Sequence, residues 1–144
     1  MTYRLNEFQV QLPPSELLDA TINILKFPEL GTSLIVSRSL LAEGETLQSN
    51  LDAQLGRLEK QVQDLRCQPG SAVRVGANQE VEAIELRSQF NKGTEKVFQY
   101  QLALVLPGSR KLLALSYVKA EKLGDTEAAH WATIKGSLVF DTPA

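Results

Sequence analysis

The chain has 144 residues, 43% of them hydrophobic and 22% charged, so it is long enough to fold as one domain around its own core. Its net charge is −2 and its lysines and arginines are scattered, which argues against nucleic acid and anionic membranes as partners. The single cysteine, Cys67, excludes an internal disulfide bond and fits a reducing compartment. No stretch reads as a membrane span or a signal peptide. We therefore expect one cytoplasmic domain over residues 1–144, without membrane insertion.

The first 40 residues predict short strands. Residues 8–12 alternate apolar and polar side chains, which predicts a half-buried strand paired in a small hairpin with residues 2–7. Further strands are expected at residues 19–27 and 32–40, separated by a turn. In the first of these, Ile22 and Ile24 point to one side, while Leu25 and Phe27 point to the other. This strand needs apolar cover on both faces, whereas antiparallel strands commonly bury only one.

A change of period at residues 43–65 predicts a long amphipathic helix. Apolar side chains recur at every third or fourth position along one stripe, formed by Leu47, Leu51, Leu55, Leu58, Val62 and Leu65. Thr46 or Gly44 is expected to cap the start of this helix, without a complete capping box. Gln54 lies within the apolar stripe, where an amide side chain needs an explanation.

Three or four more strands follow, at residues 72–75, 80–90, 97–106 and 111–119. A second helix is expected from residue 127 to about 139, capped by Asp125 or Thr126, with Trp131 on its apolar side. Consecutive strands joined by short turns favour antiparallel pairing. The predicted fold class is therefore α+β, a mostly antiparallel twisted sheet with one long central helix and one C-terminal helix.

Residues that could support catalysis are few. His130 is the only histidine, and a lone cysteine cannot complete a metal site with it, so we interpret it as a structural side chain. Cys67 has no base predicted beside it, and Glu80 and Glu82 alternate as on a solvent-facing strand. No phosphate-binding loop occurs. We expect a non-catalytic binding protein without metal or cofactor, and an enzyme is the least favoured alternative.

The later strands combine apolar and amide side chains on one face. Gln99 and Gln101 alternate onto the same face as Val97, Ala103 and Val105. A buried glutamine without partners costs about 1–3 kcal/mol, so these amides and Gln54 are consistent with a groove that is covered only part of the time. Such a groove would suit an apolar peptide whose backbone needs hydrogen bonds. The alternative, in which each glutamine sits at the edge of the core and faces water, stays open.

Four segments, taken in order, carry a resemblance to a known family: MTYRLNEFQVQLP, DATINILKFP, QLGRLEKQV and HWATIKGSLVFDTP. They resemble the DcrB/PsbP-like family, and within it the effector-associated Eag chaperones of bacterial type VI secretion. The resemblance implies a PsbP-like fold and a cytoplasmic homodimer. Such proteins bind the hydrophobic N-terminal transmembrane segments of an effector, shield them, and assist loading on the secretion spike. The resemblance places client-binding residues at Ile22, Ile24, Gln54, Leu58, Val62, Val97 and Gln101.

The implied partners are therefore an effector with N-terminal transmembrane segments and, beyond it, a spike protein. The alternative function is a non-catalytic PsbP-like scaffold or regulatory module that binds a folded protein on a flatter, more polar face. In the chaperone interpretation Ile22 and Ile24 face the groove. Leu25 and Phe27 then face the core, and Asn23 lies on the core side with a hydrogen-bond partner.

Overall fold

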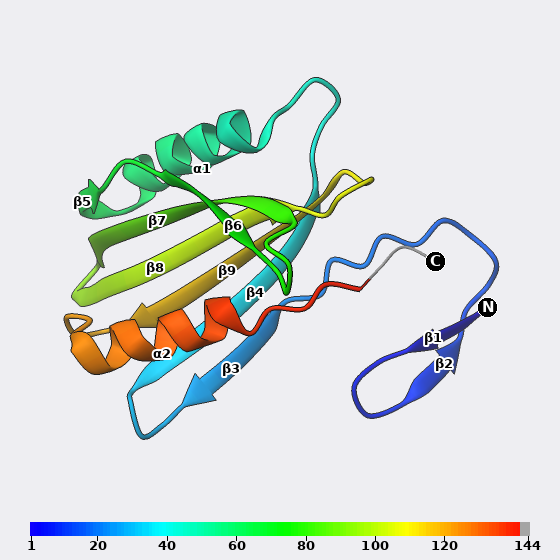
Figure 1. The fold of residues 1–144 in the computed structure, drawn as a ribbon, viewed down its shortest axis with the longest axis horizontal. Coiled ribbons are helices and arrows are strands. Elements are labelled where there is room, and N and C mark those ends of the chain that lie inside the picture. The colour runs from blue at the N-terminus through cyan, green and yellow to red at the C-terminus, as the bar shows by residue number, and fades with distance from the viewer. Residues whose placement is uncertain (142–144) are drawn as a thin grey trace.

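A seven-stranded antiparallel sheet lies between two helices in the computed structural model, which describes residues 1–141 (Figure 1). The elements along the chain are β1 (Thr2–Arg4), β2 (Gln9–Gln11), β3 (Asn23–Phe27), β4 (Thr32–Leu40), α1 (Leu47–Gln61), β5 (Gln63–Cys67), β6 (Ser71–Val75), β7 (Val81–Lys92), β8 (Glu95–Val105), β9 (Lys111–Lys119) and α2 (Asp125–Gly136). The α+β class, with a mostly antiparallel sheet and two helices, is confirmed.

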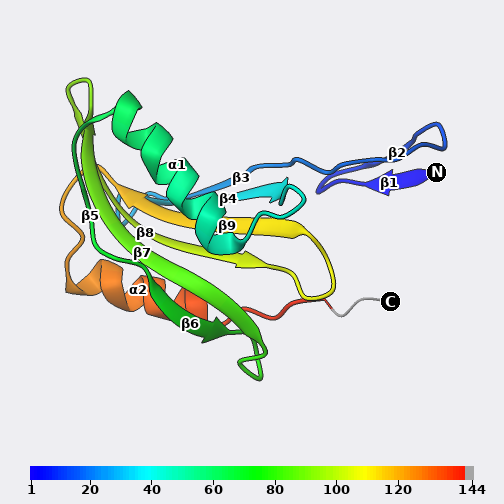
Figure 2. The same ribbon diagram turned by 90° about the horizontal axis from the view of Figure 1, so that it is seen from above.

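The sheet has the order β3-β4-β9-β8-β7-β5, and β6 also pairs with β7. β7 is long enough to serve two partners, because its first half pairs with β6 and its second half with β5. Between β5 and β6 the chain passes over β7 at Gly70. A Cβ atom there would lie 2.8 Å from the Ile84 side chain, so a larger residue would push the β7 side chains aside. α1 and α2 cover opposite faces of this sheet (Figure 2).

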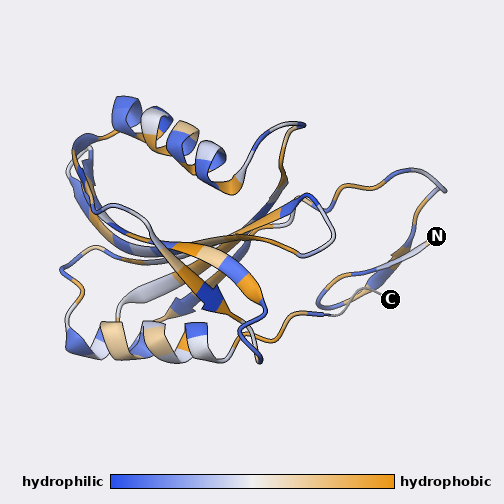
Figure 3. Cartoon of the chain, turned by 45° about the horizontal axis from the view of Figure 1, so that its top comes forward, coloured by the Kyte–Doolittle hydropathy of each residue, from blue (hydrophilic) through white to orange (hydrophobic). Residues whose placement is uncertain are grey.

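The main core lies between α2 and the sheet. Leu102, Leu104 and Tyr117 are fully buried there and pack with Trp131 of α2. The rings of Tyr117 and Trp131 stack with their centroids 5.9 Å apart. In Figure 3, α1 is coloured mostly as hydrophilic or neutral, whereas hydrophobic residues recur along the strands of the sheet. Where α2 covers it, the sheet therefore carries the main buried core.

Two half-buried ion pairs close the edge of this core. Lys119 of β9 pairs with Glu127 of α2, and Lys135 of α2 pairs with Glu85 of β7. The hydrogen bond from Lys119 holds the pKa of the Glu127 carboxyl below its ordinary value, and the same bond raises the pKa of Lys119. Both shifts show that the folded state favours the charged pair.

The lowered pKa of Glu127 predicts a pH-dependent contribution to stability. A carboxyl whose pKa is lower in the folded state stabilises the fold above its ordinary value of 4.5, and this contribution is lost as the pH falls through the lowered value. We expect Glu127→Gln to lower the melting temperature at neutral pH, with a difference from wild type that shrinks under acid conditions. Thermal unfolding followed by circular dichroism across this range measures it. A difference that stays constant in acid would contradict the prediction.

α1 is shorter than the predicted helix over residues 43–65. It ends at Gln61 because residues 63–67 join the sheet as β5, a strand that the apolar spacing concealed. Leu65 belongs to this strand and not to the helical stripe, and Val62 is the residue that caps the helix. A complete capping box is present after all: Ser49 N donates to Thr46 Oγ1, and Thr46 N donates to Ser49 Oγ. The box was missed because serine replaces the usual glutamate or glutamine.

Both ends of the chain differ from the expectation. Gly124 precedes α2 without a side-chain cap, so neither Asp125 nor Thr126 caps the helix, and α2 ends at Gly136 rather than near residue 139. The predicted hairpin forms from β1 and β2, but β2 is exposed instead of half-buried. This hairpin lies apart from the main sheet (Figure 1).

Candidate functional site

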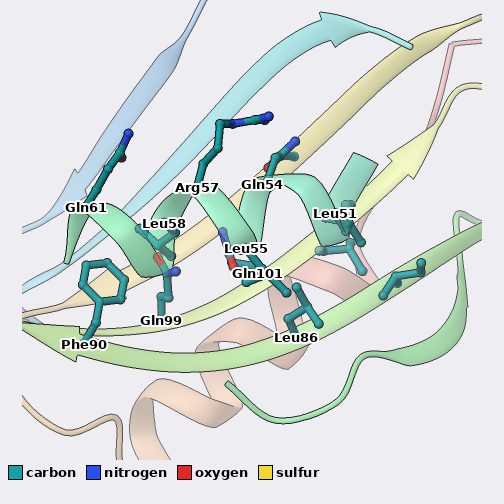
Figure 4. A pocket seen from close by; sticks show the side chains of 14 residues that line it. Leu51, Gln54, Leu55, Arg57, Leu58, Gln61, Leu86, Phe90, Gln99 and Gln101 are labelled. Carbon is teal, nitrogen blue, oxygen red and sulfur yellow. The ribbon is translucent and has the colours of Figure 1, made fainter. Parts of the chain in front are cut away.

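A hollow of about 330 Å³ opens between α1 and its face of the sheet, and we call it the α1 groove. Its walls come from α1 and from the neighbouring strands β7, β8 and β9. Its lining includes Leu51, Gln54, Leu55, Arg57, Leu58 and Gln61 of α1, Leu86 and Phe90 of β7, Gln99, Gln101 and Ala103 of β8, and Ala114 of β9. In Figure 4, Gln54, Arg57 and Gln61 leave α1 on the side away from Leu86 and Phe90.

The apolar stripe of α1 is only partly covered by the sheet. Leu51 is the one residue of α1 that is buried, in a small cluster with Leu86 and Ala103. Leu55 and Leu58 remain half-buried at the groove. The two helices therefore pack differently on the sheet, because α2 contributes Trp131 to a buried core while α1 leaves apolar surface next to an open space.

The glutamines of the groove are held by hydrogen bonds within the chain. The Gln99 side chain is buried and donates to Ser88 Oγ at 2.9 Å, and Gln101 donates to Ser116 Oγ at 3.2 Å. Gln54 donates to Asn50 Oδ1 on the same helix. Each bond uses one of the two N–H donors of its amide, so each side chain keeps its oxygen as an acceptor and one N–H as a donor for a ligand that enters the groove.

A row of side chains on the α1 face of the sheet leads from the groove to the edge strand β3. Ile24 lies opposite Ile35, which lies opposite Ser116, which in turn lies opposite Gln101 in the groove. Residues paired in this way share a face of the sheet, so Ile24 is on the α1 side. Ile22 and Ile24 are 60% and 58% exposed. The far end of this row of side chains therefore offers apolar surface that the described residues leave open to water.

The structure brings together part of the site predicted from the sequence. Gln54, Leu58 and Gln101 line the α1 groove, whereas Ile22 and Ile24 are exposed and do not line it. Val97 is half-buried and lies opposite Phe90 on the α1 face of the sheet. Val62 is half-buried at the end of α1. Neither residue lines the groove. Sequence reasoning missed several lining residues, among them Arg57, Gln61, Leu86 and Phe90. Arg57 and Gln61 follow Gln54 at helical spacing, which is a signal that could have found them.

Comparison with known proteins shows the family of the chain. The DcrB family matches residues 7–137, which is most of the chain. The chain belongs to the DcrB family. No curated protein matches it. Among solved structures it is similar to PA94 of Pseudomonas aeruginosa, a protein of unknown function described as a candidate regulator, with 19% identity, a TM-score of 0.74, and coverage of 99% of this chain and 98% of that chain. This likeness concerns the fold alone.

The opposite face of β3 in this DcrB-family protein agrees with the prediction at two of three positions. Arg38 Nη1 donates to Asn23 Oδ1 at 2.6 Å, and Phe27 packs against the main core. Leu25, predicted to face the core, is 53% exposed. The reason is that β3 is the edge strand, and α2 reaches it at Phe27, whose ring lies 4.6 Å from that of His130.

The reactive side chains of this DcrB-family protein are engaged in packing. His130 Nδ1 lies 2.7 Å from the Tyr117 hydroxyl in the main core. Burial raises the pKa of the Cys67 thiol, which disfavours the nucleophilic thiolate. Within residues 1–141, no group of three His, Cys, Asp or Glu side chains is placed to hold a metal ion. Neither of the helices described there is long and apolar enough to cross a membrane.

Proposed function

We propose that this DcrB-family protein is a chaperone or adaptor that binds hydrophobic N-terminal transmembrane segments of a type VI secretion effector in the α1 groove. It shields these segments from water and assists loading of the effector on the secretion spike. The observation that carries the proposal is the half-covered apolar stripe of α1, which faces a hollow, whereas α2 packs Trp131 into the buried core on the other face of the sheet. We further propose a PsbP-like single domain that is cytoplasmic, non-catalytic and free of cofactors.

The apolar residues of the α1 face supply a driving force for such a client. Ile22, Ile24 and Leu58 keep exposed apolar surface, and covering each of them with a client helix would contribute roughly 1–2 kcal/mol. Several such contacts together would give a useful affinity after the cost of association. The open edge at β3 would let a segment longer than the hollow lie across the sheet.

The amide side chains of the groove suit a membrane-derived client better than a purely apolar surface would. Transmembrane segments carry small polar residues that bond to neighbouring helices in a bilayer. The oxygens of Gln54 and Gln101 would accept hydrogen bonds from these residues or from exposed backbone N–H groups. Both glutamines are already fixed by Asn50 and Ser116, so little ordering would be needed when the client binds.

A second copy of the chain is the further partner we propose, as a homodimer. Of the 11 exposed large hydrophobic residues described, nine fall within residues 1–25: Met1, Leu5, Phe8, Val10, Leu17, Leu18, Ile22, Ile24 and Leu25. The β1–β2 hairpin in this region forms a sheet of its own, and isolated two-stranded hairpins are marginally stable in water. Apolar surface concentrated in this way supports a partner that covers it.

Copurification tests the proposed function. The full chain is coexpressed with a tagged N-terminal effector fragment that contains a transmembrane segment, and with the same fragment after its apolar residues are replaced by serine. We expect the chaperone to copurify with the first fragment and not with the second. Equal recovery with both fragments would refute the proposal. Binding to a folded effector domain that lacks the segment would instead support the scaffold alternative.

A further inference from the structure

A second hollow lies on the α2 side of the sheet, away from the α1 groove, and we call it the basic pocket. Its volume is about 390 Å³, and three cationic side chains line it: Arg66, Arg87 and Lys122. No carboxylate is among its lining residues. None of the three cations forms a salt bridge with any residue in the described range 1–141. In a chain of net charge −2, this is a local concentration of unpaired positive charge.

The three cations reach the basic pocket from different parts of the chain. Arg66 is on β5, opposite Gln89, and Arg87 is two residues earlier on β7, so both point to the same face of the sheet. Lys122 comes from the loop between β9 and α2. The tertiary fold therefore brings these three cations together, although they do not form a run of basic residues in the sequence.

The pocket also carries groups that would hold and orient an anion. The guanidinium of Arg87 lies over the ring of Tyr100, 5.0 Å from its centroid, which favours one position for this long side chain. The amides of Gln68 and Gln89 provide further hydrogen-bond donors at the lining. A planar guanidinium binds a carboxylate through two parallel hydrogen bonds.

The positive surface extends past the pocket itself. A neighbouring hollow of about 350 Å³ shares Arg66 and Gln89 with it and adds Lys96. One carboxylate, that of Asp64, lines this neighbouring hollow, where it accepts a hydrogen bond from Asn91. Several cations next to each other on a surface are matched to a ligand with more than one negative group.

We infer that the basic pocket binds an acidic segment of a partner protein, with Arg66 and Arg87 pairing its carboxylates and Lys122 adding long-range attraction. This goes beyond the proposed function, because the pocket lies on the face of the sheet opposite to the α1 groove and takes a ligand of opposite character. The protein would then hold two chemically different segments at once, an apolar one at α1 and an acidic one at the α2 side.

The experiment measures binding of a fluorescein-labelled peptide, rich in Glu and Asp spaced by Gly and Ser, to the full chain by fluorescence anisotropy. We expect binding that weakens as salt is raised to about 0.15 M. Each of Arg66→Gln, Arg87→Gln and Lys122→Gln should weaken it about fivefold. Lys60→Gln removes the same charge from α1 and should change the affinity less than about twofold.

The outcomes separate the inference from its rivals. Circular dichroism establishes that the variants are folded before they are compared. Failure of the wild-type chain to bind the peptide at low salt would overturn the inference. Equal weakening by Lys60→Gln would also overturn it, because binding would then follow net charge instead of the pocket. Tighter binding of a single-stranded oligouridylate than of the peptide would assign the pocket to phosphates and overturn the protein partner.

Discussion

Ile24→Asp is expected to weaken the binding of an apolar client segment by about 30-fold or more, while the protein stays folded. The Ile24 side chain is 58% exposed in the free protein, so the new carboxylate would be solvated there and the fold would tolerate it. The proposed client would cover this position and remove water from the charge. The free-energy cost of burying the carboxylate therefore destabilises the complex and not the free protein. Isothermal titration calorimetry with a detergent-free transmembrane peptide fused to a soluble carrier measures the difference.

Leu25→Asp is the matched control for this prediction. Leu25 is the next residue of β3 and is 53% exposed, but it points to the other face of the sheet. We expect it to retain most of the client affinity. Equal losses for the Ile24 and Leu25 variants would show that the α1 face is not the surface that binds the client.

The helix wall of the groove offers the same comparison. Leu58→Asp places a charge at a half-buried groove position, whereas Ala53→Asp places it at an exposed position of the same helix outside the groove lining. We expect only the first to reduce client binding. Normal client binding by both Ile24→Asp and Leu58→Asp would show that the client does not bind at the α1 groove.

Leu102→Ala is expected to lower the free energy of unfolding by about 2–5 kcal/mol. The Leu102 side chain is 0% exposed and belongs to the core cluster with Tyr117 and Trp131, so its loss leaves a cavity in that core. Such a loss is a large part of the stability of a domain of this size.

Leu58→Ala makes the same chemical change on the other side of the sheet. Because Leu58 is only half-buried beside the α1 groove, we expect a loss below about 1 kcal/mol. Urea unfolding followed by tryptophan fluorescence of Trp131 compares the two variants. Similar losses of unfolding free energy in the two variants would mean that α1 packs on the sheet as tightly as α2. The α1 face would then be part of the core and not a binding surface.

The fold class could be predicted from the sequence because local patterns specify it. The apolar runs in residues 32–40 and 111–119, bounded by turn residues, predict strands, and the helical stripe from Leu47 to Leu58 predicts a helix. β5 escaped prediction because Val62 and Leu65 continue the helical spacing, while pairing with β7 decided the conformation. Sheet pairing is a long-range interaction that a local period cannot express.

The candidate site was predicted only in part, for a related physical reason. Gln54 and Gln101 stand out in the sequence as amides among apolar side chains, and the family resemblance implied a binding role for both and for Leu58; all three line the groove. Leu25 was assigned to the core because its face is apolar, yet β3 is at the edge of the sheet and α2 reaches no farther than Phe27. Whether a strand is at the centre or the edge of the sheet decides how deeply its side chains are buried. The sequence of the strand alone does not reveal this position.

The sequence by itself therefore determined which residues form most strands and helices and which side chains share a face, because both depend on the backbone period of a few neighbouring residues. The tertiary structure alone decided which helix packs into the buried core. α2 packs Trp131 onto Tyr117 and Leu102, whereas α1 leaves Leu58 beside a hollow. It alone also brought Arg66, Arg87 and Lys122 together, because strand pairing and a loop join residues that lie far apart along the chain.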